Sequence, residues 1–237
     1  FPLQRVGKRG EGLWKRITWD EAYAEIAPRI QKCIDEKVPE QVVFQQGRSR
    51  IAAETAHFMN AIGSNTILNH RALCSLNKRA ANYISLGETD WESVDAENCK
   101  YFLNFGSNFY EAHQGGFHLL KRVIKARYDH GAKLVTFDVR LSNTAGRSDN
   151  WFAPFPGTEG AIALGMAHVI MNAGQYDKKF LEKWTNYSPE KLIAWLKPYT
   201  PEWAAKLSGL DAKDIGRVAL EFAAQRPAVA AFTNRGS

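Results

Sequence analysis

Two short apolar runs constrain the fold of this chain more than any other feature. Residues 101–105 and 132–137 are apolar at nearly every position, which is typical of parallel strands buried on both faces. Between them, Gly115 and Gly116 precede a helical pattern that runs to about Tyr128, so the segment forms one unit of strand, helix and strand. A strand at 41–45, a glycine turn and a helix from about Ile51 to Ile62 also follow one another. The sequence therefore predicts an α/β fold, with open, mostly parallel sheets and flanking helices.

Capping signals and apolar spacing place further elements. Thr18-Trp-Asp-Glu21 is a capping box that opens a helix, and Cys33 lies on the apolar face of that helix, where we expect it in the core. Cys99 directly precedes a strand and is expected to be structural. The tryptophans at 184, 195 and 203 are expected to be packing anchors.

Composition limits the class of protein. The 237 residues are 45% hydrophobic and 24% charged, enough for one large domain or two smaller ones. The net charge of +6 is dispersed, and the one basic cluster, at 7–16, contains an acid and lies in a predicted turn, so nucleic-acid binding is set aside. Three widely spaced cysteines give no disulfide framework. The chain starts without Met or a signal peptide and stops in a strand, so we expect part of a longer protein.

A single cysteine, Cys74, lies between a predicted strand end at 66–68 and a predicted helix from Leu76 to Leu86. A helix N-terminus and neighbouring basic side chains, among them Lys78, would favour the thiolate, which attacks substrates or binds soft metals. The alternative is a small buried hydrophobe.

Polar loops follow the two apolar strands. Gly106 begins the first and Asp138 the second, and the carboxyl edge of a parallel sheet is the usual crevice for a nucleotide-like ligand. The Asp138 carboxylate can accept hydrogen bonds from a ribose or an amino-pteridine, or it can cap a loop. The first loop lacks the Gly-x-Gly-x-x-Gly pattern of an ordinary NAD site. Gly157 and Thr158 would offer N–H groups and a hydroxyl to an anion, or simply cap the next helix.

Five motifs together resemble those of the molybdopterin oxidoreductases of the dimethyl sulfoxide reductase superfamily. Each motif is weak alone, but they occur in the family's order and cover nearly all of the chain. They are Arg5–Gly12 with Trp14–Ala22, Asn69–Cys74, Asn104–Asn108, Asp138–Arg140 with Thr144, Ala145 and Asp149, and Pro156–Glu159.

The resemblance implies a catalytic subunit that carries molybdenum or tungsten on two molybdopterin guanine dinucleotides, with Cys74 as protein ligand to the metal. A soft thiolate suits a metal that sulfur already binds. The residues implied at the pterin end are Gln46, Gly47, Arg48 and Asn69. Those implied around one guanine dinucleotide are Gly106, Ser107, Asn108, Glu111, Asp138, Arg140, Ser142, Gly157, Thr158 and Glu159.

The resemblance also implies a division into domains. Residues 1–100 would carry the metal-ligand loop, and residues 101–237 would bind one guanine dinucleotide. Members of the family usually begin with a domain for a 4Fe–4S cluster and end with a β-rich domain. This sequence contains neither, so we expect a fragment.

The residues around Cys74 bear on the reaction. Ser75 follows it where formate dehydrogenases of the family have a histidine, which counts against a formate dehydrogenase-like activity. His70 has the place of a histidine in the arsenate, polysulfide and thiosulfate reductase branch, although it can also be a loop residue bonded to backbone. With Arg48 and Lys78 it would form a positive pocket for a small oxyanion or sulfur chain. We expect a reductase that transfers an oxygen or sulfur atom with two electrons.

That branch implies partners and a location. An Fe–S electron-transfer subunit and a membrane subunit that interacts with quinone would connect the enzyme to anaerobic respiration, in the periplasm and at the membrane through these partners. Two other interpretations stay open. One is a metal-free structural homologue in a membrane quinone reductase complex, and the other is a plain nucleotide-binding module.

Overall fold

The structure is a computed structural model that describes residues 1–47, 50–70, 74, 76–87, 94–111 and 116–232. The chain divides into two compact units, Phe1–Leu76 and Asn77–Ser237, which we call the N-terminal unit and the C-terminal unit. Arg48, a predicted pocket residue, lies outside the described residues. In the described part, no helix is both long and apolar enough to cross a membrane. The division into functional domains 1–100 and 101–237 stays a prediction.

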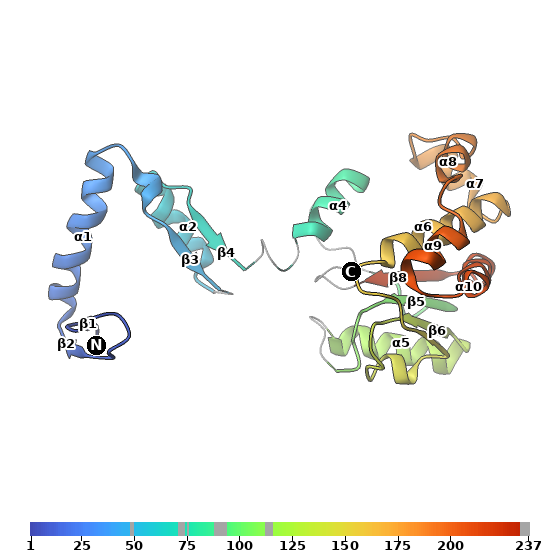
Figure 1. Cartoon of the computed structure of the whole chain (residues 1–237), viewed down its shortest axis with the longest axis horizontal. Coiled ribbons are helices and arrows are strands. Elements are labelled where there is room, and N and C mark those ends of the chain that lie inside the picture. Colours follow the sequence, from blue (N-terminus) through green and yellow to red (C-terminus); the bar gives the residue numbers. More distant parts are fainter. Residues whose placement is uncertain (48–49, 71–73, 75, 88–93, 112–115, 233–237) are drawn as a thin grey trace. The chain divides into compact units, whose positions relative to one another are not determined.

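The N-terminal unit begins with a hairpin and a long helix (Figure 1). Strands β1 (Leu3–Arg5) and β2 (Trp14–Arg16) pair antiparallel, and helix α1 (Trp19–Asp35) follows. The predicted capping box is present. The Glu21 backbone N–H donates to Thr18 Oγ1 (3.2 Å), and the Thr18 N–H donates to the Glu21 carboxylate (2.6 Å). Two orphan donors at the helix start are thereby satisfied.

The rest of the N-terminal unit is a βαβ arrangement. A 3₁₀ turn, η1 (Pro39–Gln41), precedes strand β3 (Phe44–Gln46), helix α2 (Ala52–Ala61) and strand β4 (Ile67–Asn69). Strands β3 and β4 pair in parallel, which agrees with the predicted fold class of mostly parallel sheets. The first strand starts later than the predicted residues 41–45 because the turn occupies their beginning.

Few apolar side chains are buried in the N-terminal unit. On α1, Tyr23 is 61% exposed and Ile26 53% exposed, although both lie on the apolar stripe of the helix. Cys33 on the same stripe is half-buried, so its expected place in the core is wrong. The hairpin contacts α1 through Gln4, whose Nε2 donates to the Glu25 carboxylate (2.8 Å), and η1 also packs against α1.

The C-terminal unit contains a four-stranded parallel sheet of order β7-β6-β5-β8 (Figure 1). It confirms the predicted α/β class. Its strands are β5 (Tyr101–Phe105), β6 (Lys133–Phe137), β7 (Asn150–Phe152) and β8 (Ala228–Phe232). Helix α4 (Leu76–Leu86), which has the predicted bounds, precedes the sheet. The connection between β6 and β7 contains only a 3₁₀ turn, η2 (Ala145–Arg147).

Helices cover both faces of this sheet. Helix α5 (Gly116–His130) connects β5 to β6 on one face. The other face carries α6 (Glu159–Asn172), α9 (Pro201–Ser208) and α10 (Ala212–Ala224). Two short helices, α7 (Lys178–Trp184) and α8 (Pro189–Leu196), lie between α6 and α9 in the sequence.

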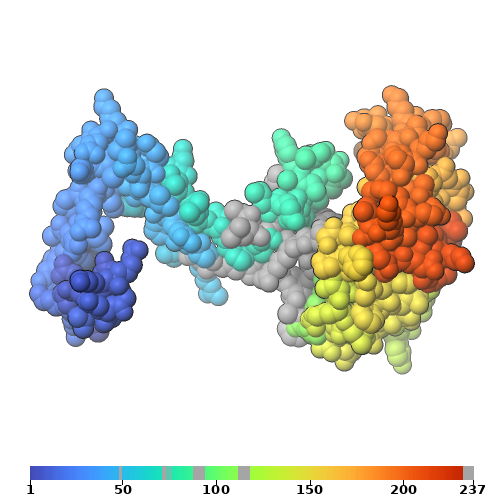
Figure 2. Space-filling view, viewed as in Figure 1, coloured from blue at the N-terminus to red at the C-terminus, as the bar shows by residue number. Residues whose placement is uncertain are grey.

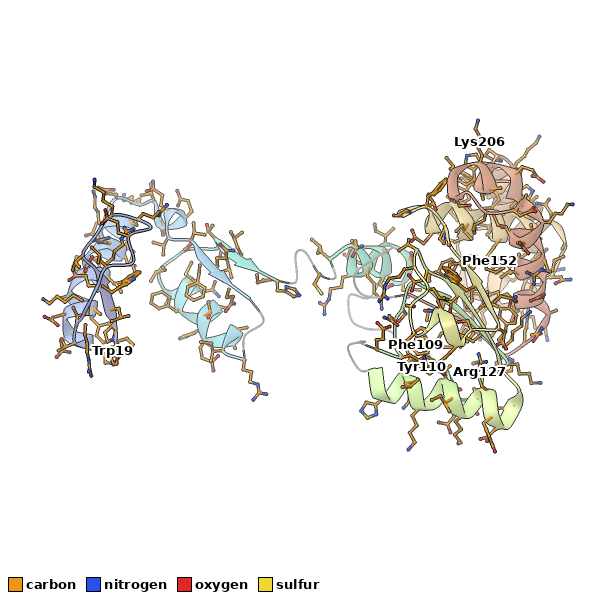
Figure 3. The ribbon with its side chains drawn as sticks, turned by 60° about the horizontal axis from the view of Figure 1, so that its bottom comes forward. Trp19, Phe109, Tyr110, Arg127, Phe152 and Lys206 are labelled. Carbon is orange, nitrogen blue, oxygen red and sulfur yellow. The ribbon has the colours of Figure 1, made fainter. Side chains whose placement is uncertain are left out.

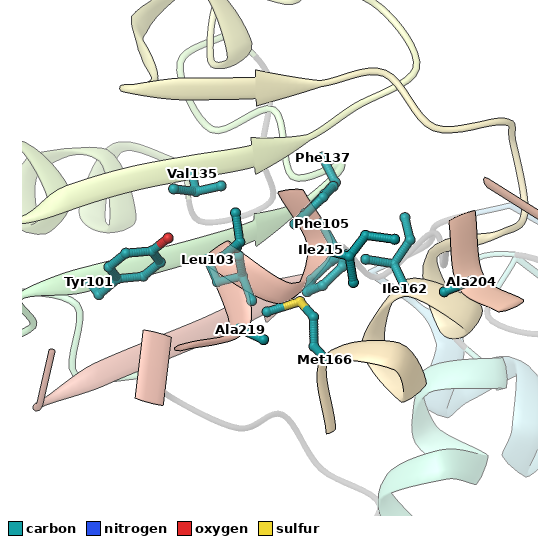
Figure 4. Close-up of a cluster of buried hydrophobic side chains, with 11 residues drawn as sticks. Tyr101, Leu103, Phe105, Val135, Phe137, Ile162, Met166, Ala204, Ile215 and Ala219 are labelled. Carbon is teal, nitrogen blue, oxygen red and sulfur yellow. The ribbon is translucent and has the colours of Figure 1, made fainter. Parts of the chain in front are cut away.

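Alternation along β5 explains how one strand serves two cores. Leu103 and Phe105 pack with Ile162 of α6 and Ile215 of α10 (Figure 4), whereas Phe102 packs with α5. Successive side chains of a strand point to opposite faces, so the apolar residues of β5 fill both layers.

A glycine allows α6 and α9 to approach closely. A Cβ atom on Gly165 would lie 2.9 Å from the Cβ of Ala204, closer than real Cβ contacts. The small side chains at this crossing therefore fix the spacing of the helix layer.

The tryptophan and cysteine predictions had mixed outcomes. Trp203 packs against the core, but Trp184 and Trp195 are 68% and 52% exposed, so their role as packing anchors is wrong. Cys99 is buried and donates from Sγ to the Ala96 carbonyl (3.1 Å), and burial raises the pKa of its thiol to about 11. Its structural role is confirmed.

Candidate cofactor-binding site

The carboxyl edge of the C-terminal sheet is a topological switch point. The chain runs from β5 outward through β6 to β7, and then returns through α6 to α10 to place β8 on the other side of β5, so the strand order reverses between β5 and β8. Loops that leave neighbouring strands in opposite directions open a crevice at the carboxyl ends of those strands. Phe105 and Phe137 are paired at this edge, and the two predicted polar loops follow them.

The first loop turns sharply at Gly106. Its N–H donates to the Phe137 carbonyl (2.8 Å), and its φ of +64° belongs to the left-handed region that favours glycine. The buried side chain of Asn104 holds the next part of the loop, because its Nδ2 donates to the Ser107 carbonyl (2.9 Å) and its Oδ1 accepts from the Ser107 N–H (3.1 Å). The strand end and the loop therefore form one rigid piece.

Ser107 carries an unsatisfied polar atom in this loop. The residue is 1% exposed, and its Oγ has no hydrogen-bond partner among the described residues. A buried hydroxyl without a partner costs free energy, typically about 1–3 kcal/mol. A polar ligand in the crevice would remove that cost, so the residues present fit a nucleotide-like group.

The second loop is held by its own acid. Asp138 accepts a hydrogen bond from Ser142 Oγ (2.7 Å), which in turn accepts from the Ala145 N–H (3.2 Å). The Asp138 carbonyl accepts from Trp151 Nε1 (2.8 Å), which connects the loop to β7. These contacts match the loop-capping alternative for Asp138, and its contact with a ligand stays a prediction.

Glu111 joins the two loops. Its carboxylate accepts from Asn108 Nδ2 (2.5 Å), Arg140 Nη2 (3.1 Å) and the Asn143 N–H (2.9 Å). The hydrogen bond from the Asn143 backbone, then those from Asn108 and Arg140, lower the pKa of Glu111. A second bridge runs from Thr144 Oγ1 to Asn108 Oδ1 (2.8 Å).

Aromatic side chains anchor the first loop to the core. Phe109 is buried and packs edge-on against Phe102, with ring centroids 5.8 Å apart. Phe109 and Tyr110 lie next to each other (Figure 3), with centroids at 5.4 Å. The Arg147 guanidinium lies 5.2 Å from the Tyr110 ring centre, so a residue of the second loop covers the first.

The third predicted segment follows β7. Gly157 has a φ of +80° with open space beside it, and Thr158 precedes α6. The Thr158 hydroxyl donates to the Phe155 carbonyl (2.6 Å), so it does not cap the helix. Glu159 begins α6, and its buried Oε2 has no partner within the described ranges.

In the N-terminal unit, the strand pairing brings Gln46 and Asn69 together. They are register partners at the carboxyl ends of β3 and β4, and Gly47 and His70 follow them. Gln46 Oε1 accepts a hydrogen bond from Thr55 Oγ1 of α2 (3.3 Å). Two predicted pterin-end residues are thus neighbours, although their function stays a prediction.

Cys74 lies four residues after His70. The Cys74 N–H donates to the His70 carbonyl (3.0 Å), and Cys74 is 8% exposed. His70 Nε2 is buried and has no partner in the part of the chain that the structure describes. No three His, Cys, Asp or Glu side chains gather as a metal site among those residues. Lys78 is buried in α4 of the C-terminal unit.

Sequence reasoning missed some groups that shape the crevice. Asn143 contributes a backbone N–H, which leaves no signature in a sequence. The buried Thr136 accepts from Asn104 (3.3 Å) and bonds Ser148 Oγ (2.7 Å). A polar residue inside an otherwise apolar strand was the signal that could have indicated it.

The fold is that of an α/β protein whose parallel sheet has a switch point, which is where many proteins of this fold class bind nucleotides. Comparison with known proteins is more specific. A family model described as molybdopterin oxidoreductase matches residues 1–229. The chain belongs to the molybdopterin oxidoreductase family.

Individual relatives agree with this assignment. The chain is 34% identical over 95% of its length to the thiosulfate reductase molybdopterin-containing subunit PhsA of Salmonella typhimurium, and covers 29% of it. It is 31% identical over 96% of its length to the dimethyl sulfoxide reductase DmsA of Haemophilus influenzae, and covers 32% of it. The chain therefore spans about a third of the length of these relatives.

A solved structure has the same fold. Acetylene hydratase from Pelobacter acetylenicus superposes with a TM-score of 0.82 at 29% identity, covering 98% of this chain and 32% of that protein. The predicted fold class and the predicted family are confirmed.

Proposed function

We propose that the chain is part of the catalytic subunit of a molybdenum or tungsten enzyme with two molybdopterin guanine dinucleotides, and that the C-terminal unit holds one of them. This proposal rests on the buried Ser107 hydroxyl at the switch point, which has no hydrogen-bond partner among the described residues. A polar ligand there would supply that partner. Membership of the molybdopterin oxidoreductase family supports the choice of ligand.

Three loops would hold the guanine dinucleotide. Ser107 and the backbone of the first loop would contact it from β5, and the exposed Arg140 guanidinium would supply positive charge for its phosphates from β6. Gly157 and the start of α6 would add backbone N–H groups. The remaining predicted contacts are Asn108, Asp138, Ser142, Thr158 and Glu159.

The N-terminal unit would provide the metal ligand. Cys74 is 8% exposed, and its sulfur would be a soft ligand for the metal. Gln46, Gly47 and Asn69 would contact the pterin end from the edge of the small sheet. When bound, the metal group supplies two-electron redox chemistry. His70, Lys78 and Arg48 would bind and orient an anionic substrate and stabilise negative charge on it.

The proposed reaction is reduction of a sulfur or arsenic oxyanion, or of polysulfide, in anaerobic respiration. The relative named thiosulfate reductase supports this choice. The unpartnered His70 Nε2 is suited to a hydrogen bond with an oxyanion. An Fe–S subunit and a quinone-interacting membrane subunit, in the periplasm, would complete the electron path, and a 4Fe–4S domain would belong to the same polypeptide.

A hydratase activity is the second candidate. The superposed structure is named acetylene hydratase, so likeness to this fold does not fix an oxygen-transfer reaction. The two candidates differ in a measurable way, because hydration consumes no electrons.

The test uses the full-length native protein and compares Cys74→Ser with Cys33→Ser. Plasma mass spectrometry measures Mo, W and Fe, X-ray absorption measures the sulfur shell of the metal, and turnover is measured with thiosulfate, polysulfide, arsenate and acetylene. We expect Mo or W in the wild type, loss of one sulfur neighbour and of turnover in Cys74→Ser, and no change in Cys33→Ser. Unchanged metal and turnover in Cys74→Ser would refute the ligand assignment. Turnover of acetylene alone would favour the hydratase.

A further inference from the structure

We propose that Glu111 is a positioning residue. It holds the two crevice loops in the arrangement that receives the guanine dinucleotide, and it does not itself contact the ligand. This inference rests on the proposed function of the crevice and assigns Glu111 a role other than the cofactor contact that the resemblance implied.

The hydrogen-bonding capacity of the Glu111 carboxylate is used within the protein. Oε2 accepts from both Asn108 and Arg140, and Oε1 accepts from the Asn143 N–H. An ionised carboxylate is an acceptor with about four lone-pair sites, so it can serve these three donors together. A neutral amide of the same length cannot, because its NH₂ group would face another donor.

These donors come from both loops. Asn108 lies in the loop after β5, three residues before Glu111, whereas Arg140 and Asn143 lie 29 and 32 residues further along, after β6. A contact across two separate loops fixes the position of one relative to the other. The backbone N–H of Asn143 is an especially firm anchor since it has no rotamers.

The contacts of Glu111 with Asn108, Arg140 and Asn143, which we call the clamp, also determine which groups face the ligand. Asn108 is occupied at both ends of its side chain, by Glu111 at Nδ2 and by Thr144 at Oδ1. Ser107, by contrast, keeps a buried hydroxyl without a partner within the described ranges. Arg140 binds Glu111 through Nη2 and leaves its other N–H groups for an anion.

Charge favours positioning over contact. A carboxylate placed directly against a phosphate adds like-charge repulsion. Bound to Arg140 at 3.1 Å, the same carboxylate instead orients the guanidinium. Glu111 therefore acts on an anionic ligand through Arg140 and through the loop backbone.

The experiment uses the whole chain without cofactor, and GDP as the probe. The variant is Glu111→Gln, and the matched control is Glu97→Gln. Glu97 precedes β5, away from the crevice loops, and its carboxylate forms an ion pair with Lys125. Two quantities are measured: the rate of amide hydrogen exchange at Asn143 without ligand, and the Kd for GDP by calorimetry. Because hydrogen bonds to a charged acceptor are stronger than those to a neutral one, we expect Glu111→Gln to raise both the exchange rate and the Kd by roughly tenfold or more. Glu97→Gln should change neither.

Each other outcome overturns the proposal in a distinct way. A higher Kd for GDP with an unchanged amide exchange rate at Asn143 would mean that Glu111 contacts GDP directly. Faster exchange with an unchanged Kd would make the clamp merely structural. If the wild type does not bind GDP, the proposed function of the crevice is wrong. If the wild type binds GDP but Glu111→Gln lacks the expected effects, only the role proposed for Glu111 is wrong. If Glu111→Gln does not fold, Thr144→Val removes the second bridge to Asn108 and should change both quantities in the same direction by less.

Discussion

The two units of this chain differ in how many large side chains they bury. In the C-terminal unit, large side chains such as Phe102, Leu134 and Ile215 are almost fully enclosed between sheet and helices. In the described part of the N-terminal unit, Met59 is the one large side chain buried to that degree. In Figure 2 the hairpin is dark blue and α1 is a lighter blue.

This difference separates the stability of the two proposed sites. The guanine dinucleotide crevice stands on a sheet that holds its own loops, whereas the proposed metal-ligand loop belongs to a unit that exposes Trp19 at the start of α1 (Figure 3) and Tyr23 one turn later. In a unit of this size even a well-formed hydrophobic core rarely supplies more than about 3–5 kcal/mol of stability. We infer that the N-terminal unit depends on contacts outside itself.

Separating the units tests the comparison most strongly. Residues 77–237 should unfold in urea as one cooperative transition, because both sheet faces are covered within that segment. Residues 1–76 should show no such transition. Circular dichroism and amide exchange would measure both fragments. A sigmoidal urea transition for 1–76 would break the contrast between the units.

A matched pair of isoleucines tests the comparison within the intact chain. Ile162 is 0% exposed, so Ile162→Ala should lower the free energy of unfolding by about 2–5 kcal/mol, through lost burial and a cavity. Ile26 is more than half exposed, so Ile26→Ala should change it by no more than about 0.5 kcal/mol. Urea midpoints for both variants measure this. A loss of similar size for Ile26→Ala would show that α1 is covered in solution.

The same contrast explains how much of the fold the sequence predicted. Strand β5 and helix α4 have the predicted bounds, because a strand buried on both faces and an amphipathic helix are recognisable locally. Cys33 and Trp195 were assigned to cores that do not enclose them. Periodicity identifies an apolar face, but burial depends on what covers that face.

The loops that form the site could be predicted from the sequence, but the hydrogen bonds between them could not. Glycine and acid at the ends of apolar strands indicated the crevice, and the structure brings Gly106 and Asp138 to that one edge. The bond from the Asn143 backbone to Glu111 depends on the register of β5 and β6 and on the path of the second loop. The roles assigned to Cys74 and His70 stay predictions.

Glu221 gives a smaller test, at the amino edge of the C-terminal sheet. It accepts from Lys133 (2.6 Å), Arg217 (2.9 Å) and Tyr101 (3.1 Å). Glu221→Gln should cost about 1–2 kcal/mol, a value reduced for partial solvent screening. Urea unfolding at pH 7 measures this, with Glu182→Gln as an exposed control.

The pH dependence of that network has a defined sign. Burial raises the pKa of Glu221, but the hydrogen bonds from Lys133, Arg217 and Tyr101 outweigh it, so the net pKa is lowered. A lowered pKa in the folded state stabilises the fold above the unfolded-state pKa, and this stability is lost as pH falls through the folded pKa. Wild type and Glu221→Gln should therefore converge in stability as the pH falls through the lowered pKa of Glu221. Equal differences at pH 7 and in acid would contradict this account.

Two helix caps give the finest test, since the same chemistry occurs in both units. Thr18 caps α1, and Thr200 caps α9 by accepting from the Trp203 N–H (3.2 Å). Loss of such a cap costs about 1 kcal/mol. Because α9 packs on the core, Thr200→Ala should lower the global urea midpoint, whereas Thr18→Ala should speed amide exchange in the first turn of α1 by about fivefold and leave the midpoint unchanged. If Thr18→Ala shifts the midpoint as much as Thr200→Ala does, the two units unfold together, and the N-terminal unit draws its stability from the C-terminal unit.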